Sequence, residues 1–210
     1  MQRLIVCGLV LLYCLVSACE KPDTTAPVLR LNEDTVTHYL GDAYLEPGFS
    51  VTDNHTCDLD GAVTVNGVVD INNYGTYSLT YSVTDAAGNT TQEVRAVDVI
   101  LRKENYYHLT YLAKDTCTSG VYIYTGLIQD CDCPQNAVTV ANISNFGLSA
   151  VFTLPLSGQY NEIILMDTAK AAVSFTGSAI MSTNADTLLW NYTITDSVQS
   201  DICISTWIKQ

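Results

Sequence analysis

Basic residues are scarce in this sequence. Among its 210 residues, 9 Lys and Arg stand against 22 Asp and Glu, which gives a formal net charge of −13. Proteins that bind nucleic acid contact its phosphates with clustered Lys and Arg side chains, so this shortage argues against a nucleic-acid partner. The chain has three histidines and lacks the Gly-x-Ser-x-Gly, His-Glu-x-x-His and phosphate-binding glycine motifs of common enzyme classes. We therefore expect neither catalytic activity nor a cofactor.

Helical periodicity is missing from the C-terminal half, where no stretch repeats its apolar residues every 3.6 positions over three turns. The chain is 48% hydrophobic, which is far too much for a disordered protein. It has 13 tyrosines and many β-branched residues, which favour strands. The sequence thus predicts an all-β protein, long enough for one large domain or two small ones.

Residues 1–18 have the features of a secretory signal peptide. Arg3 precedes an apolar run of 13 residues, 4–16, which is shorter than the stretch of about 20 needed to cross a bilayer. The run ends at Val16-Ser17-Ala18-Cys19, which resembles a bacterial lipobox. The resemblance implies that Cys19 carries a lipid, which attaches the chain to a membrane without spanning it. The alternative is a short buried helix with an incidental cysteine.

Residues 19–26 form a polar, proline-containing segment that is typical of a tether. Glu20 and Asp23 follow the predicted lipidated cysteine and resemble the surface-export signal of Bacteroidota lipoproteins. This resemblance implies a lipoprotein of the outer membrane that is exposed at the cell surface. A periplasmic placement is the alternative.

Residues 27–101 contain short alternating runs separated by turns, which is the pattern of a β-sandwich. Two motifs stand out: Leu40-Gly41-Asp42-x-Tyr44-x-Glu46-Pro47-Gly48-Phe49, and the run from Tyr74 to Thr91 with Thr84-Asp85-Ala86-Ala87-Gly88-Asn89 inside it. They resemble a bacterial Ig-like domain of unknown function that is repeated in surface proteins and lipoproteins. The resemblance implies an Ig-like β-sandwich that serves as a spacer or adhesive module and has no catalytic residues.

Four aspartates of this segment lie in or beside predicted turns: Asp53, Asp58, Asp60 and Asp85. Converging carboxylates bind calcium, but the segment has no EF-hand-like string of ligands. A short acidic side chain also caps its own turn by accepting backbone N–H groups. We favour turn capping over the calcium alternative and expect no metal site.

Residues 105–210 are predicted to form a second β domain, an antiparallel sheet or sandwich. Its strand candidates are residues 106–112, 120–125, 137–143, 148–154, 162–166, 171–176, 187–195 and 201–208. The segments Asp115-x-Cys117-x-x-Gly120-x-Tyr122, Ile143-Ser144-Asn145-Phe146-Gly147 and Tyr192-Thr193-Ile194-Thr195 are similar to the C-terminal β module that follows such Ig-like domains in Bacteroidota surface lipoproteins. That similarity implies a SusC/SusD-type outer-membrane transporter as a partner.

Four cysteines lie in this half: Cys117, Cys131, Cys133 and Cys203. In an exported protein an even set is read first as disulfides, and three pairings are open. Cys131 and Cys133 project to the same face of a strand, so we expect them to pair with Cys117 and Cys203 rather than with each other. Cys57 is then left over, buried or reduced. Zinc is disfavoured because Cys-x-Cys lacks the usual spacing and no histidine is near.

Aromatic side chains are the candidate contact surface. Trp190 shares its strand face with apolar residues, which indicates a core position. Trp207 lies on the face opposite the isoleucines of its strand, so we expect an exposed ring there, while Tyr122 and Tyr124 share one face of theirs. Exposed flat rings suit stacking against sugars. The alternative for Trp207 is that it covers a second sheet or a disulfide.

The leading hypothesis is a non-catalytic, lipid-anchored accessory protein that captures a glycan or peptide for an outer-membrane transporter. The alternative is a structural or adhesive surface protein that contacts another protein or a host surface. The predicted organisation is a signal peptide over residues 1–18, a lipidated tether over 19–26, the Ig-like domain over 27–101 and the C-terminal β domain over 105–210.

Overall fold

The computed structural model describes residues 21–107, 109–131, 137–145, 149–153, 162–170 and 173–210. Most of the regular structure in these ranges is β-strand. The helices there are three short 3-10 helices, η1 (Asp60–Ala62), η2 (Lys103–Asn105) and η3 (Ile143–Asn145). The predicted all-β fold is confirmed. Within the same ranges, no helix is long and apolar enough to cross a membrane. Contacts group the described residues into two compact units, one with residues 21–32, 49–65 and 81–93, the other with residues 33–48, 66–80 and the described part of 94–210.

The first unit contains a two-stranded antiparallel sheet. Strand β1 (Val28–Leu31) pairs with β3 (Phe49–Thr52), which places Leu29 opposite Val51. Leu29 is buried, while its neighbours along β1 are exposed, as the alternation of a half-buried strand requires. Tyr81 is fully buried and meets the ring of Phe49 edge-on, with 5.9 Å between the ring centroids. These apolar side chains form the core of this unit.

A four-stranded sheet has the order β2-β6-β5-β4, with β2 (Thr35–Tyr39), β6 (Thr90–Ile100), β5 (Gly75–Thr84) and β4 (Thr64–Asn66). Strand β2 runs parallel to β6. Arg95 of β6 is completely buried, so its charge must be paired and hydrogen-bonded. Its guanidinium donates to the carbonyls of Glu33, at 2.7 Å, and Gly48, at 2.8 Å, and forms an ion pair with Glu46. The Glu46-Pro47-Gly48 motif thus closes over a buried cation.

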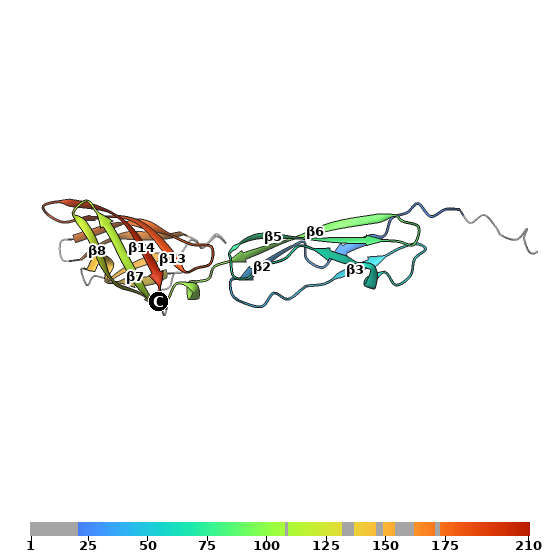
Figure 1. Ribbon diagram of the computed structural model, residues 1–210, viewed down its shortest axis with the longest axis horizontal. Coiled ribbons are helices and arrows are strands. Elements are labelled where there is room, and N and C mark those ends of the chain that lie inside the picture. Colours follow the sequence, from blue (N-terminus) through green and yellow to red (C-terminus); the bar gives the residue numbers. More distant parts are fainter. Residues whose placement is uncertain (1–20, 108, 132–136, 146–148, 154–161, 171–172) are drawn as a thin grey trace, which may run out of the picture. The chain divides into compact units, whose positions relative to one another are not determined.

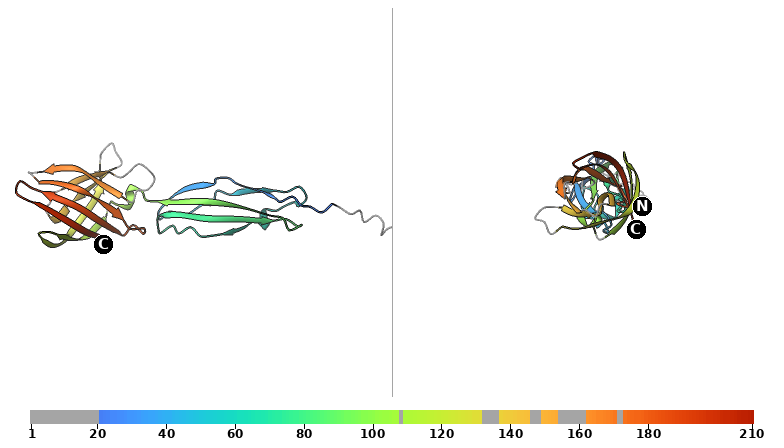
Figure 2. Two further views of the ribbon diagram at one scale, coloured as in Figure 1. Left: turned by 90° about the horizontal axis from the view of Figure 1, so that it is seen from above. Right: turned by 90° about the vertical axis from the view of Figure 1, so that its left-hand side faces the viewer.

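The C-terminal part of the second unit is a closed barrel of eight strands (Figures 1 and 2). Each strand pairs antiparallel with the next along the chain, and the last pairs with the first, which gives an up-and-down barrel. The strands are β7 (Leu109–Cys117), β8 (Gly120–Asp130), β9 (Ala137–Ala141), β10 (Ser149–Thr153), β11 (Glu162–Lys170), β12 (Val173–Met181), β13 (Thr187–Thr195) and β14 (Ser200–Lys209). The expected antiparallel sheet therefore closes on itself.

Large rings fill the barrel. The ring of Trp207 lies 5.5 Å from that of Trp190 and 5.9 Å from those of Tyr111 and Tyr124, measured between centroids. Gly126 on β8 makes room for it, because a Cβ atom at that position would lie 2.2 Å from the indole. A small barrel needs such alternation of large and small residues to pack its interior.

Two expectations about aromatic residues are wrong. Trp207 is 1% exposed and Tyr124 is buried, so neither offers a free ring for stacking. On β14 the isoleucines face outward instead, and Ile204 is 64% exposed. The physical reason is that barrel closure turns the face with the bulkiest ring inward, where it fills volume that isoleucine could not. Trp190 is buried, as its strand pattern indicated.

The expected disulfide pairing is also wrong. Cys117 and Cys203 bond to each other, because they lie directly opposite one another where β7 pairs with β14. Cys131 is disulfide-bonded as well, and Cys133 lies outside the described residues. Cys57 is free and exposed.

Candidate functional site

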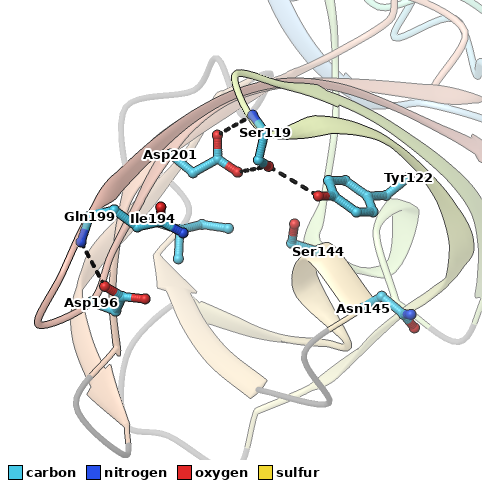
Figure 3. Close-up of a pocket in the computed structure, with 8 residues that line it drawn as sticks. All are labelled: Ser119, Tyr122, Ser144, Asn145, Ile194, Asp196, Gln199 and Asp201. Carbon is cyan, nitrogen blue, oxygen red and sulfur yellow. Dashed lines mark hydrogen bonds between the residues drawn. The ribbon is translucent and has the colours of Figure 1, made fainter.

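A pocket of about 290 Å³ opens at one end of the barrel (Figure 3). The turn between β7 and β8, the turn between β13 and β14, and helix η3 after β9 all lie at this end, as the strand register requires. Its lining residues are Ser119, Tyr122, Ser144, Asn145, Ile194, Asp196, Gln199 and Asp201. Most of them carry a hydroxyl, amide or carboxylate group, so the pocket is suited to a polar ligand.

Asp201 fixes the wall formed by the β7–β8 turn. Its carboxylate accepts hydrogen bonds from the hydroxyls of Thr118 and Ser119, and from the backbone N–H of Ser119 at 3.1 Å. The Ser119 hydroxyl also lies 3.1 Å from the phenol oxygen of Tyr122. Burial raises the pKa of Asp201, but the hydrogen bonds from Ser119 and Thr118 outweigh burial and hold that pKa below its usual value.

Asp196 fixes the opposite turn, between β13 and β14. Its Oδ1 accepts the backbone N–H groups of Val198 at 2.7 Å and Gln199 at 2.8 Å. The N–H groups of Gln199 and Val198 lower the pKa of Asp196. Both pocket carboxylates are therefore ionised at neutral pH and committed to holding turns, which gives this end of the barrel a negative, acceptor-rich rim.

Helix η3 brings Ser144 and Asn145 to the pocket in an unusual backbone conformation. Their φ angles are 52° and 60°, and Asn142 just before the helix has a φ of 62°. Residues other than glycine pay roughly 1–3 kcal/mol for such left-handed conformations, which persist where surrounding contacts enforce them. Here the backbone N–H of Ser144 donates to the buried phenol of Tyr124 at 2.8 Å, and the Asn142 amide donates to the carbonyl of Thr125 at 2.9 Å.

A buried carboxylate lies behind this wall of the pocket. Asp115 of β7 is fully buried and accepts hydrogen bonds from the hydroxyls of Tyr124 at 3.2 Å, Tyr192 and Ser205. Burial raises the pKa of both phenols well above the ordinary value, so they remain donors to Asp115. The chain of contacts Asp115–Tyr124–Ser144 thus connects the barrel interior to the pocket lining.

Sequence reasoning located part of this site. Tyr122 lines the pocket and is 40% exposed, which leaves its ring available to a ligand. Tyr124 acts from behind by holding Ser144, and Trp207 packs in the interior. Asp115, Ser119, Asp196 and Asp201 were missed as site residues. The signal available for Asp115 was its place on the same strand face as Tyr111 and Ala113. Cys19 lies outside the described residues.

Comparison with protein families supports the N-terminal assignment. Residues 30–99 match the family "Bacterial surface protein, Ig-like domain". The chain therefore carries an Ig-like domain of the bacterial surface-protein kind, and the resemblance drawn from its turn motifs is confirmed. A comparison with curated proteins gave no match.

Two solved structures show weak similarity to this chain. A lipoprotein from Bacteroides thetaiotaomicron is 19% identical with a TM-score of 0.36, over 88% of this chain and 100% of that one. The structure of CBM51-2 in complex with GlcNAc, and INT domains, from Clostridium perfringens ZmpB is 12% identical with a TM-score of 0.32, over 88% of this chain and 44% of that one. With TM-scores this low, neither structure supports an inference about the fold or the function of this chain.

Proposed function

We propose that this protein is a non-catalytic, lipid-anchored binding protein of the cell surface whose barrel pocket takes a glycan. The observation that carries the proposal is the pocket at the end of the barrel, in which polar groups converge around the partly exposed ring of Tyr122. Binding sites for small ligands combine a few placed polar groups with apolar or aromatic surface. At about 290 Å³ the pocket suits one end of a saccharide rather than a long chain.

The lining matches the chemistry of a sugar. The ionised carboxylates of Asp196 and Asp201 accept hydrogen bonds from sugar hydroxyls, and the amide of Asn145 donates as well as accepts. Tyr122 offers apolar surface to the C–H face of a sugar ring, whereas Ile194 lines the pocket but is 6% exposed. A peptide would satisfy the same acceptors through its N–H groups, and it is the alternative ligand.

The electrostatics favour binding over catalysis. Glycoside hydrolysis needs one carboxyl group with a raised pKa that protonates the leaving oxygen. The pKa values of Asp196 and Asp201 are both lowered, because Asp196 accepts hydrogen bonds from its own turn and Asp201 accepts them from the turn between β7 and β8. Neither residue is therefore poised as a general acid at neutral pH, which supports a capture role.

The anchoring and the partner complete the proposal. The lipobox-like sequence that ends at Cys19 would attach the chain to the outer membrane through a lipid. The surface-protein Ig-like match over residues 30–99 supports display of the barrel at the cell surface. In this proposal the captured ligand passes to a transporter of the SusC/SusD type, a partner that is inferred from the sequence resemblance alone.

Affinity electrophoresis of the full chain in non-ionic detergent, against a panel of polysaccharides, tests the proposal. We expect one class of glycan to retard the protein, and Tyr122→Ala to abolish the retardation because the exposed ring is lost. Tyr39→Ala is the matched control, since Tyr39 is similarly exposed but lies on β2. Failure of every glycan to retard the chain, or equal retardation of both variants, would overturn the glycan assignment.

A second candidate function is adhesion through the outside of the barrel. The outward faces of β8 and β14 expose several large aliphatic side chains: Val121, Ile123, Ile202, Ile204 and Ile208. Exposed apolar side chains that gather on one face are typical of protein-contact sites. Under this reading Ile204→Lys would weaken attachment to a protein or host surface and leave glycan retardation unchanged, whereas Tyr122→Ala would leave attachment unchanged.

A further inference from the structure

Three carboxylates converge in the first unit, away from the barrel. Asp23 precedes β1, Asp53 follows β3, and Asp85 lies in the loop between β5 and β6. One carboxylate oxygen from each residue lies within 4.8 Å of those of the other two. Oxygens that share a calcium ion, each 2.3–2.6 Å from it, are separated by at most about twice that distance. The spacing of the three groups therefore fits a single Ca²⁺.

Each carboxylate holds its own loop with part of its bonding capacity. Asp53 Oδ2 accepts the N–H groups of His55 at 3.0 Å and Thr56 at 2.7 Å. Asp85 Oδ1 accepts those of Ala87 at 2.9 Å and Asn89 at 2.8 Å. The turn-capping role expected from the sequence is present at both positions, and it fixes these two carboxylates in place.

The remaining bonding capacity points to a ligand. Asp23 Oδ2 and Asp53 Oδ1 are both buried, and neither has a hydrogen-bond partner among the residues that the structure describes. The side chain of Asp23 is 10% exposed, and Asp85 is 6% exposed. A buried, unpaired carboxylate oxygen is costly, and turn capping explains only the partnered oxygens. A cation between the three groups would satisfy both orphan oxygens.

The negative charge of the cluster also favours a bound cation. Among the described residues, the ion pairs of these carboxylates are limited to Asp23 with His55, at 3.6 Å, and that imidazole is exposed. The cluster therefore concentrates negative charge that no arginine or lysine in the described ranges balances.

We propose that Asp23, Asp53 and Asp85 form a calcium site that fastens the segment before β1 to the loops of the Ig-like domain. All three side chains provide oxygen donors, which Ca²⁺ prefers. The receiving loops are already joined, since Thr56 Oγ1 accepts the backbone N–H of Ala86 at 3.3 Å. The Asn89 amide reaches the carbonyls of Asp23 and Thr25 at 3.4 and 3.3 Å.

The site would set how the chain leaves its membrane anchor. Asp23 lies in the segment that the sequence assigns to the tether after Cys19. With calcium bound, this segment is fixed to the loops; without it, like charges repel at the same point. Extracellular modules bind calcium with dissociation constants of about 0.1–1 mM, so the site would be filled outside a cell. This inference does not depend on the barrel pocket.

Calcium-dependent thermal unfolding of the full chain in detergent tests the site, starting from protein dialysed against EDTA. We expect about 10 mM Ca²⁺ to raise the Tm of the Ig-like transition by about 5 °C or more, which is the shift that mass action predicts for such affinities. Asp53→Asn and Asp23→Asn should each abolish the shift, because the amide removes a charge and a metal ligand. Either variant suffices if the other fails to fold.

Asp70→Asn is the matched control. Asp70 also caps a turn, through Asn72 N–H at 2.9 Å and the Asn73 amide at 2.8 Å, which leaves both of its oxygens partnered. It should keep the full calcium response. A Tm that calcium does not change, an equal response in Asp53→Asn and Asp70→Asn, or stabilisation by Zn²⁺ and not by Ca²⁺ would each overturn the proposal.

Discussion

The disulfide between Cys117 and Cys203 joins the first and last strands of the barrel. These strands, β7 and β14, also pair through their backbones from Cys203 opposite Cys117 to Lys209 opposite Tyr111. Replacing both cysteines with alanine would remove the covalent bond and leave that ladder intact. We expect the variant to fold into the same barrel with a lower free energy of unfolding.

The expected decrease in the free energy of unfolding follows from the length of the loop that the disulfide closes. The two cysteines are 86 residues apart in sequence. In the chain-entropy model, removing a cross-link that closes a loop of that length raises the entropy of the unfolded chain, which stabilises the unfolded state by roughly 4.6 kcal/mol at 25 °C. Measured losses for native disulfides span about 2–5 kcal/mol. A loss of this size would lower the Tm of the barrel by about 10 °C or more.

Tryptophan fluorescence in a urea titration isolates the barrel, because both tryptophans of the chain, Trp190 and Trp207, are buried inside it. The double variant should unfold at a urea concentration lower by about 1 M or more. Cys57→Ala is the control and should leave the midpoint unchanged, since Cys57 is free and exposed. A decrease of less than about 1 kcal/mol in the free energy of unfolding would refute the argument that this bond between β7 and β14 restricts the unfolded chain.

Two further predictions concern the barrel interior. Gly126→Ala should destabilise the barrel by about 1–3 kcal/mol or more, because the added Cβ would meet the Trp207 ring at 2.2 Å. Gly61→Ala is the control and should not destabilise the protein, since no atom of the described residues lies within 4 Å of a Cβ added there. Urea unfolding compares the two variants, and equal midpoints would contradict the packing argument. Burial raises the pKa of Tyr111, Tyr124 and Tyr192 above the ordinary value near 10. Below pH 10 these phenols are neutral in both states, so the free energy of unfolding is unaffected by pH through them. Above pH 10 only the unfolded phenols ionise, so the free energy of unfolding falls as the pH rises. Each phenol then lowers the free energy of unfolding by up to about 1.4 kcal/mol per pH unit, and absorbance at about 295 nm should show the three phenols ionising together with loss of the tryptophan signal. Ionisation of these phenols near pH 10 in a folded barrel would contradict this prediction.

The Ig-like half was predictable because its turn chemistry is local. Gly48 and Gly88 have φ angles of 89° and 93°, which glycine adopts without strain. Asp85 accepts the N–H groups of residues two and four positions later in the chain. Each of these constraints involves a few neighbouring residues, so the motif that encodes it is visible in the sequence alone.

The barrel was harder to predict because its contacts are distant in sequence. Alternation on β14 separates isoleucines from Cys203, Ser205 and Trp207, but a strand pattern does not state which face turns inward. That choice depends on Gly126, Tyr111 and Trp190, which come from other strands. The disulfide followed the same rule, since strand register and not the spacing of Cys131 and Cys133 brought Cys117 to Cys203.

The pocket shows why stability and binding should separate in this protein. The walls that contain Asp196 and Asp201 are fixed by hydrogen bonds within and between neighbouring turns. The wall formed by η3 is different, because Ser144 is held in its strained conformation by Tyr124, whose partner Asp115 lies in the barrel interior. Loss of the exposed Tyr122 ring should therefore weaken a ligand without unfolding the barrel, whereas loss of the Tyr124 hydroxyl should weaken both, because it releases Ser144 and leaves Asp115 with one donor fewer.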